Sequence, residues 1–215
     1  MDQIRLEQVM PEPLENTDVS QSNIWLQKAS FQKGLNYQVF AASGKGKSTF
    51  VHLLYGIRND YKGHIWFDNK PIDQLTNALW ANIRQTSLSI VFQDLRLFPH
   101  LTALQNIQVK AVLQPSVASV AEIEAMADRL GIAHVLNKPA KTLSYGERQR
   151  TAIIRSLVQP FDFLLLDEPF SHLDEQNIAK AAELIQEKCT ANRAGFVMTS
   201  LGYEYVLRID QKYAL

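Results

Sequence analysis

The chain has few of the features that would direct it outside the cell or into a membrane. Its one cysteine, Cys189, cannot form an intramolecular disulfide, which suits a reducing compartment. The longest apolar run, around Phe163 to Leu166, is too short to cross a bilayer. Residues Met1 to Pro13 carry charges and prolines where a signal peptide has an apolar core. We therefore expect a cytoplasmic protein that reaches a membrane only through another protein.

An excess of charge of either sign is also missing. Lys plus Arg and Asp plus Glu number 22 each, so the formal net charge is zero. Such a balance gives no electrostatic sign of binding to DNA, RNA or anionic lipid, and we predict no direct nucleic-acid partner. The 215 residues suffice for one domain with a substantial core but not for two large ones.

Apolar runs that end in polar clusters predict a parallel α/β core. Tyr37 to Ala42 is β-prone and meets a Gly/Ser/Lys cluster, after which Phe50 to Gly56 is apolar again, the order of strand, loop and helix. Phe161 to Asp167 and Gly195 to Thr199 predict two more buried strands. Parallel sheets bind ligands at the carboxyl ends of such strands.

The remaining patterned segments predict additions to this core. Ser119 to Leu130 and Gln176 to Cys189 have the apolar spacing of helices. Gly63 to Ile72, with Asp68-Asn69 at its turn, is typical of a hairpin. The predicted fold class is α/β, with a mostly parallel sheet, an antiparallel β lobe and an inserted helical subdomain.

The segment between the first predicted core strand and its helix approximates the P-loop pattern. Its residues are Ala41, Ala42, Ser43, Gly44, Lys45, Gly46, Lys47, Ser48 and Thr49. Backbone N–H groups of such a loop and the following helix N-terminus point at phosphate oxygens, so we expect residues 42–49 to bind phosphates. Lys47 would reach the terminal phosphates and Ser48 would bind Mg²⁺. Lys45 is interpreted as a solvated charge, and the competing interpretation of the whole segment is a polar surface loop.

Position 41 departs from the strict P-loop pattern, which has glycine there. Ala41 would cost about 1 kcal/mol if the backbone at this position needed a positive φ. A cost of this size is tolerable.

Two carboxylates follow the strand that ends at Leu166. At this edge of the sheet Asp167 can hold Mg²⁺ through water, and Glu168 can polarise a nucleophilic water. Acids after a strand also serve as helix caps or loop charges. Their combination with a P-loop favours the catalytic interpretation.

A third motif narrows the family. Leu143-Ser144-Tyr145-Gly146-Glu147-Arg148-Gln149-Arg150 precedes the acidic strand and resembles the signature motif of the ATP-binding cassette family. A P-loop alone leaves kinases, GTPases and helicases open. The ordered series of P-loop, Gln93, signature, acidic strand and Ser171-His172-Leu173-Asp174 is similar to the cassette family from about Ile24 onward. Residues 97–106 also resemble it, especially the small ATPase subunits of lipoprotein-release and macrolide-export systems.

This resemblance implies an architecture and an activity. The fold would be a single P-loop ATPase domain over residues 1–215, with core and β lobe at about 1–93 and 160–215 and a helical subdomain at about 94–159. The chain would be an ATP-binding and ATP-hydrolysing subunit that dimerises around ATP and drives a separate transmembrane permease. The second subunit would be another copy of this chain. Its place would be the cytoplasmic face of the inner membrane.

The resemblance also implies roles for single residues. Gln93 matches the Q-loop glutamine, which in the family binds Mg²⁺ and relays movement to the membrane partner. Ser144, Gly146 and Glu147, at a helix N-terminus, would bind the γ-phosphate held by a second copy. An apolar groove beside Gln93, flanked by Leu95, Leu97 and Phe98, would receive a short helix of the permease.

The chain departs from the family at a catalytic position. Ser200 follows Met198-Thr199, where the family has its switch histidine. A serine can donate a hydrogen bond to phosphate but cannot carry positive charge, and a positioned proton-transfer group contributes roughly 10²–10⁴-fold. We assign Ser200 a catalytic role beside Glu168 and Gln93, and we predict slow hydrolysis.

Two further departures concern binding. The aromatic residue that stacks on adenine in the family is missing, with Pro13 near its place, and Trp25 is interpreted as a core residue. Loss of one stacking partner costs about 1–3 kcal/mol. Tyr145 replaces a glycine of the signature, where it either packs on nucleotide or hinders dimer closure.

Two alternatives remain open at this point. One is a nucleotide-gated binding or assembly module that closes on ATP but hardly hydrolyses it. The other is a soluble cassette protein of DNA repair, translation or chromosome organisation, which the neutral charge and the lack of a coiled-coil insert disfavour.

Overall fold

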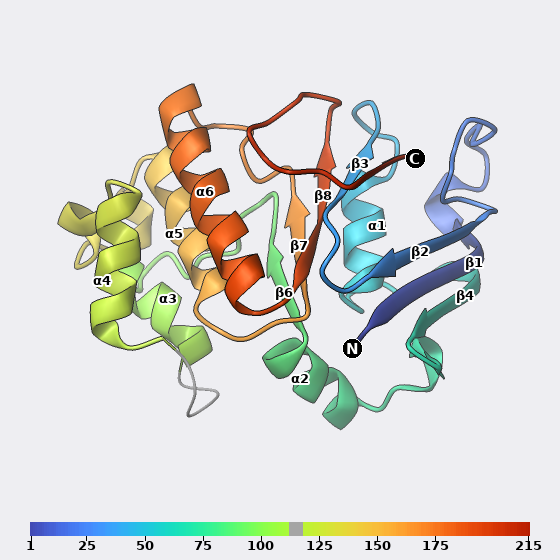
Figure 1. The fold of residues 1–215 in the computed structure, drawn as a ribbon, viewed down its shortest axis with the longest axis horizontal. Coiled ribbons are helices and arrows are strands. Elements are labelled where there is room, and N and C mark those ends of the chain that lie inside the picture. The colour runs from blue at the N-terminus through green and yellow to red at the C-terminus, as the bar shows by residue number, and fades with distance from the viewer. Residues whose placement is uncertain (112–117) are drawn as a thin grey trace.

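A five-stranded parallel sheet forms the centre of the molecule (Figure 1). The computed structural model describes residues 1–111 and 118–215. In spatial order the strands are β6 (Leu88–Val91), β7 (Phe163–Asp167), β8 (Gly195–Ser200), β3 (Tyr37–Phe40) and β9 (Gln211–Ala214). All neighbouring strands run parallel, which confirms the predicted parallel core.

A four-stranded antiparallel sheet lies beside it, on the right in Figure 1. Its strands are, in order, β2 (Lys28–Gln32), β1 (Gln3–Pro11), β4 (Tyr61–Phe67) and β5 (Lys70–Pro71). β4 and β5 pair across Asp68 and Asn69, so the predicted hairpin and the predicted β lobe are confirmed. A short 3₁₀ helix, Glu12–Leu14, follows β1.

Six α-helices in residues 1–111 and 118–215 complete the fold. They are α1 (Lys47–Leu54), α2 (Asn77–Thr86), α3 (Ala103–Ala111), α4 (Val120–Arg129), α5 (Tyr145–Leu157) and α6 (Glu175–Ala191). The two helices predicted from apolar spacing are α4 and α6. α4 begins after Ser119, which forms a capping box with Glu122, and α6 begins after Asp174, whose side chain accepts the Asn177 N–H.

Both faces of the parallel sheet are buried. Leu164 and Leu166 of β7 pack in one apolar cluster with α3, α4, α5 and α6, whereas Phe163 and Leu165 pack in a second with α1 and the antiparallel sheet. Figure 1 shows these helices on opposite sides of the sheet. A strand buried on both faces needs no polar residues, which explains why the run shows no alternation.

No helix within residues 1–111 and 118–215 is long and apolar enough to span a bilayer. Cys189 is buried in α6, and burial raises the pKa of its thiol to about 12, so the thiol is protonated at neutral pH. α3, α4 and α5 fall within 94–159, but their cluster continues into α6 and the sheet, and the subdomain boundaries stay a prediction.

A half-buried lysine, Lys110, lies where α3 meets the end of α1. The Lys110 ammonium is 3.4 Å from the Tyr55 hydroxyl. Burial, and next the charges of Arg155 and Arg84, lower the pKa of Lys110 from 10.5 to about 8. Arg84 itself lies over the Tyr55 ring, 5.4 Å from its centroid. The folded state therefore releases this proton more readily than the unfolded chain does.

We expect Lys110→Met to stabilise the protein at pH 7 and to flatten part of its pH dependence. Between pH 8 and 10.5 the unfolded chain holds a proton at Lys110 that the folded protein has released, so stability rises with pH across this window. The variant lacks this contribution. Urea unfolding at pH 7 to 10 measures it, with Lys180→Met, an exposed lysine of α6, as the control that keeps the rise. An unchanged slope in Lys110→Met contradicts the expectation.

Candidate functional site

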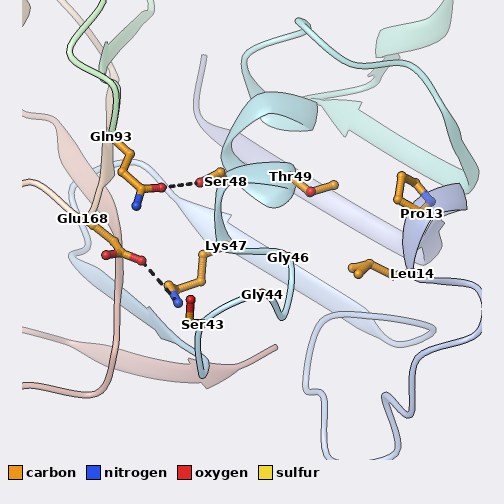
Figure 2. Close-up of a pocket in the computed structure, with 10 residues that line it drawn as sticks. All are labelled: Pro13, Leu14, Ser43, Gly44, Gly46, Lys47, Ser48, Thr49, Gln93 and Glu168. Atoms are coloured by element: carbon orange, nitrogen blue, oxygen red, sulfur yellow. Dashed lines mark hydrogen bonds and ion pairs between the residues drawn. The ribbon is translucent and has the colours of Figure 1, made fainter.

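A pocket with a volume of about 350 Å³ lies at the carboxyl ends of β3, β6 and β7 (Figure 2). It is lined by Pro13, Leu14, Ser43, Gly44, Gly46, Lys47, Ser48, Thr49, Gln93 and Glu168. Most of the predicted phosphate-binding residues therefore lie around one cavity. The predicted Q-loop glutamine, Gln93, and the predicted base, Glu168, line the same cavity, as does Pro13, near the place of the missing aromatic.

The loop between β3 and α1 has the geometry of an anion site. Gly44 and Gly46 have φ values of 77° and 94°, a left-handed conformation that favours glycine. Gly46 is the N-cap of α1 and has no side chain to cap the helix, which leaves the N–H groups of the first turn for an anion. Ala41 has no positive φ, so the conditional cost predicted for this alanine does not arise.

Lys47 is held inside the loop. Its ammonium donates to the backbone oxygens of Ala41 (2.9 Å) and Ala42 (3.0 Å), and it forms an ion pair with Glu168 at 3.2 Å. The side chain is only 5% exposed. The ion pair crosses the pocket, as Figure 2 shows. Lys45, by contrast, is exposed on the turn.

The two carboxylates at the end of β7 have different surroundings. Asp167 is buried: its Oδ1 accepts the Thr199 hydroxyl (2.8 Å), and its Oδ2 has no hydrogen-bond partner. Burial raises the pKa of Asp167, and the neighbouring Ser48 and Thr199 hydroxyls counteract part of this rise. A cation beside the unpartnered oxygen would stabilise the ionised form.

Glu168 lines the pocket in a strained conformation. Its φ is 47°, in the left-handed region that non-glycine residues rarely adopt. Such strain costs of order 1–3 kcal/mol and collects at functional sites. The backbone N–H of Glu168 donates to the Thr199 hydroxyl at 3.3 Å, which helps to hold this geometry.

The Ser48 hydroxyl donates to Oε1 of Gln93 at 2.9 Å (Figure 2). Two oxygens bound at right angles to Mg²⁺, each about 2.1 Å from it, lie about 3 Å apart, so this pair fits an octahedral magnesium site. No cluster of three or more His, Cys, Asp or Glu suited to a metal occurs in residues 1–111 and 118–215. The oxygens of Ser48, Gln93 and Asp167 would therefore need phosphate oxygens and water to complete such a site.

The predicted signature residues lie outside the pocket lining, at the start of α5. Ser144 is the N-cap: its hydroxyl accepts the Glu147 N–H, and the Glu147 carboxylate accepts the Ser144 N–H at 2.8 Å. The Ser144 hydroxyl also donates to the Glu147 carboxylate at 2.8 Å, and this bond, and next the one from the Ser144 N–H, lower the pKa of Glu147. The Glu147 carboxylate thus caps the helix. A Cβ added at Gly146 would lie 3.6 Å from the backbone oxygen of His172, an ordinary van der Waals contact.

Ser200 also lies outside the pocket lining. Its hydroxyl is buried and accepts hydrogen bonds from the Gln38 side chain (3.0 Å) and the Gly202 N–H (3.2 Å). Its backbone oxygen accepts the Ala41 N–H. In this conformation the serine is part of the support beneath the loop, and its catalytic role stays a prediction.

Several residues of the site escaped the sequence analysis. Leu14 lines the pocket beside Pro13 and packs on Gly46. The Thr199 hydroxyl donates to the Asp167 carboxylate and accepts the Glu168 N–H, so it contacts both acidic residues. Arg155, a buried arginine of α5, donates to the backbone oxygens of Leu95 and Arg96. Its place within the mostly apolar run Ala152 to Val158 was the available signal.

Two smaller expectations have mixed outcomes. Trp25 is buried against Phe50, as predicted for a core residue. Of the residues expected to flank a docking groove, Leu95 is buried, whereas Phe98 is 53% exposed. A groove of about 110 Å³ lies nearby: Leu95 and Leu97 line it, Gln93 and Phe98 do not, and its walls also include Asp94, Lys141 and Arg148. The apolar docking groove therefore stays a prediction.

Comparison with known proteins identifies the family. The family model described as ABC transporter matches residues 27–171. The lipoprotein-releasing system ATP-binding protein LolD of Saccharophagus degradans is 30% identical over 199 residues, which cover 88% of this chain and 87% of that protein. The protein of the same name from Xanthomonas oryzae pv. oryzae is 32% identical over 85% of this chain and 75% of its own length.

Solved structures agree with this result. The structure of cbiO1 from Clostridium perfringens, part of the ABC transporter complex cbiONQ, has a TM-score of 0.71 and 27% identity, covering 96% of this chain and 81% of that one. The dimeric structure of MJ0796, a bacterial ABC transporter cassette, has a TM-score of 0.79 and 22% identity over 92% and 88% of the two chains, and shows the same fold. The chain therefore belongs to the ABC transporter family, as an ATP-binding subunit.

Proposed function

We propose that this chain binds Mg²⁺ and ATP in the pocket of Figure 2 and hydrolyses the nucleotide slowly, as a dimer of two copies that drives a transmembrane permease. The convergence of Lys47, Ser48, Gln93 and Glu168 on one cavity, with Asp167 behind it, carries the proposal. The names of the relatives, lipoprotein-releasing system ATP-binding proteins, support a permease of that type.

Binding of the terminal phosphate begins with the lysine. Lys47 now shares its charge with Glu168 and two backbone oxygens. A γ-phosphate at the N-terminus of α1 attracts the ammonium more strongly than one carboxylate does, because it carries more negative charge and the helix N-terminus favours anions. Lys47 then neutralises charge on the phosphate, and Glu168 is released to contact water.

Hydrolysis uses that released carboxylate. A water oxygen attacks the γ-phosphorus and transfers a proton to Glu168, while the bond from phosphorus to the β–γ bridging oxygen breaks and its electrons leave with ADP. Lys47 and the first-turn N–H groups of α1 stabilise the charge that develops. Mg²⁺, held by Ser48, Gln93 and, through water, Asp167, would supply electrostatic stabilisation of the phosphate oxygens.

The dimer would complete each site from the partner copy. Ser144 and Gly146 lie at the N-terminus of α5, outside the pocket of their own chain, where the helix dipole favours an anion. Glu147 supports this end by fixing Ser144. Two copies arranged head to tail bring each α5 start to the other copy's nucleotide. The dimer would lie at the cytoplasmic face of the membrane, held there by the permease.

We expect Glu168→Gln to lower ATP turnover by about 10²-fold or more and to accumulate an ATP-bound dimer, because the variant keeps the shape of the site but loses the base. Lys47→Ala should abolish nucleotide binding. A phosphate-release assay and light scattering of the same samples measure both. Lys180→Ala, an exposed change in α6, serves as the control with wild-type turnover.

Two outcomes contradict this assignment. Turnover of Glu168→Gln within a few-fold of wild type removes Glu168 as the base. Wild-type protein that dimerises on ATP without turnover, both alone and with its permease, favours the nucleotide-gated module instead.

We expect Ser200→His to raise turnover about tenfold or more, because the family has a histidine at this position and an imidazole can transfer a proton that a serine cannot. Ser200→Ala separates the two roles of the hydroxyl: turnover within about twofold of wild type makes it a support beneath the loop, bonded to Gln38 and Gly202, and a larger fall supports the catalytic role. Steady-state kinetics, with thermal unfolding to verify the fold, test both. Equal rates for Ser200→His and wild type would show that the missing histidine does not limit this enzyme.

A further inference from the structure

One side chain at the start of α5 joins two loops at the edge of the pocket. The Tyr145 hydroxyl donates a hydrogen bond to the backbone oxygen of Gln93 at 3.2 Å. Its ring packs on the His172 imidazole, with centroids 4.1 Å apart and planes tilted by 58°. The Arg148 guanidinium carbon lies 5.2 Å from the same ring centroid. Tyr145 thus connects the loop after β6 with the loop after β7.

The residue that Tyr145 holds is also the residue that contacts Ser48. Gln93 accepts the Ser48 hydroxyl through its side-chain oxygen, while its backbone oxygen accepts the Tyr145 hydroxyl. Gln93 is exposed, so packing does little to restrict it. A free glutamine side chain has up to about 2 kcal/mol of rotamer entropy to lose. The position of its amide oxygen therefore depends on how firmly the backbone at 93 is fixed.

The segment that follows Gln93 is fixed by the same helix. Leu95 and Arg96 have φ values of 61° and 45°, two consecutive non-glycine residues in the left-handed region. Their backbone oxygens accept hydrogen bonds from Arg155, a buried residue of α5. α5 thus holds residues 93–96 at two points, by Tyr145 at its first residue and by Arg155 further along.

We propose that Tyr145 is a positioning residue for the metal-dependent part of nucleotide binding. Its hydroxyl fixes the Gln93 backbone against α5 and so keeps the Gln93 amide oxygen next to the Ser48 hydroxyl, where both can bind Mg²⁺. His172 packs against the phenol ring. This inference rests on the proposed role of Gln93 as a magnesium ligand.

The test compares nucleotide affinity with and without metal. Tyr145→Phe removes only the hydroxyl and leaves the ring on His172. The Kd of a fluorescent ATP analogue is measured in EDTA and in Mg²⁺, and the ratio of the two gives the enhancement by Mg²⁺. We expect Tyr145→Phe to reduce this enhancement roughly three- to tenfold, the effect of one net hydrogen bond, with the Kd in EDTA unchanged.

A matched control separates this effect from the general loss of a phenol hydroxyl. Tyr213→Phe in β9 also removes a hydroxyl that donates to a backbone oxygen, that of Ser30 in β2. It should keep the wild-type enhancement. A wild-type enhancement in Tyr145→Phe, or a loss of affinity equal in EDTA and in Mg²⁺, overturns the inference.

A second pair of variants distinguishes this inference from the proposed function. Gln93→Ala should reduce the enhancement, and Tyr145→Phe added to it should cause no further reduction, because Tyr145 acts through Gln93. A full further reduction in the double variant overturns the role of Tyr145 but leaves Gln93 as a ligand. If Gln93→Ala alone keeps the wild-type enhancement, the metal role of Gln93 and the inference fall together.

Discussion

Parallel pairing of β7 with β6 and β8 is the constraint on which the site depends. Parallel strands end at the same edge of a sheet, and the register sets Val91 opposite Leu166 and Asp167 opposite Thr199. The residues just beyond those ends include Gln93 and Glu168, so both reach the pocket without long loops. A slip of one residue would exchange the faces of the two acids and remove the carboxylate from the cavity.

Burial on both faces of the sheet keeps that register. Leu164 and Leu166 are fully buried toward the helices, and Phe163 and Leu165 are fully buried toward α1 and the antiparallel sheet. A shifted strand would keep apolar residues on both faces but would bury Glu168 in place of Asp167. The cost of burying a charge without a partner opposes this shift. The Thr199 hydroxyl gives Asp167 a partner only in the observed register.

α5 takes part both in the proposed binding of a second copy's ATP and in holding the Gln93 loop of its own chain. Its N-terminus offers Ser144 for a second copy, while Arg155 and Tyr145 hold the loop that begins at Gln93. A movement of α5 during dimer closure would therefore be transmitted to Gln93 in the same chain. The connection consists of the hydrogen bonds from Tyr145 to Gln93 and from Arg155 to Leu95 and Arg96. It gives Tyr145 a function within its own subunit, in addition to its place at the signature.

The parallel core, the P-loop, the acidic strand end and the helices α4 and α6 could be predicted from the sequence, because they depend on short-range spacing and on runs of apolar residues, and the ordered motifs resembled those of the family. The directions of the Ser200 and Tyr145 side chains became known from the folded chain alone. Both alternatives derived for Tyr145 involved nucleotide or a second copy, yet its hydroxyl contacts Gln93, 52 positions away in its own chain. Such contacts depend on how loops from separate strands meet at one sheet edge, and spacing along the chain carries no information about that meeting.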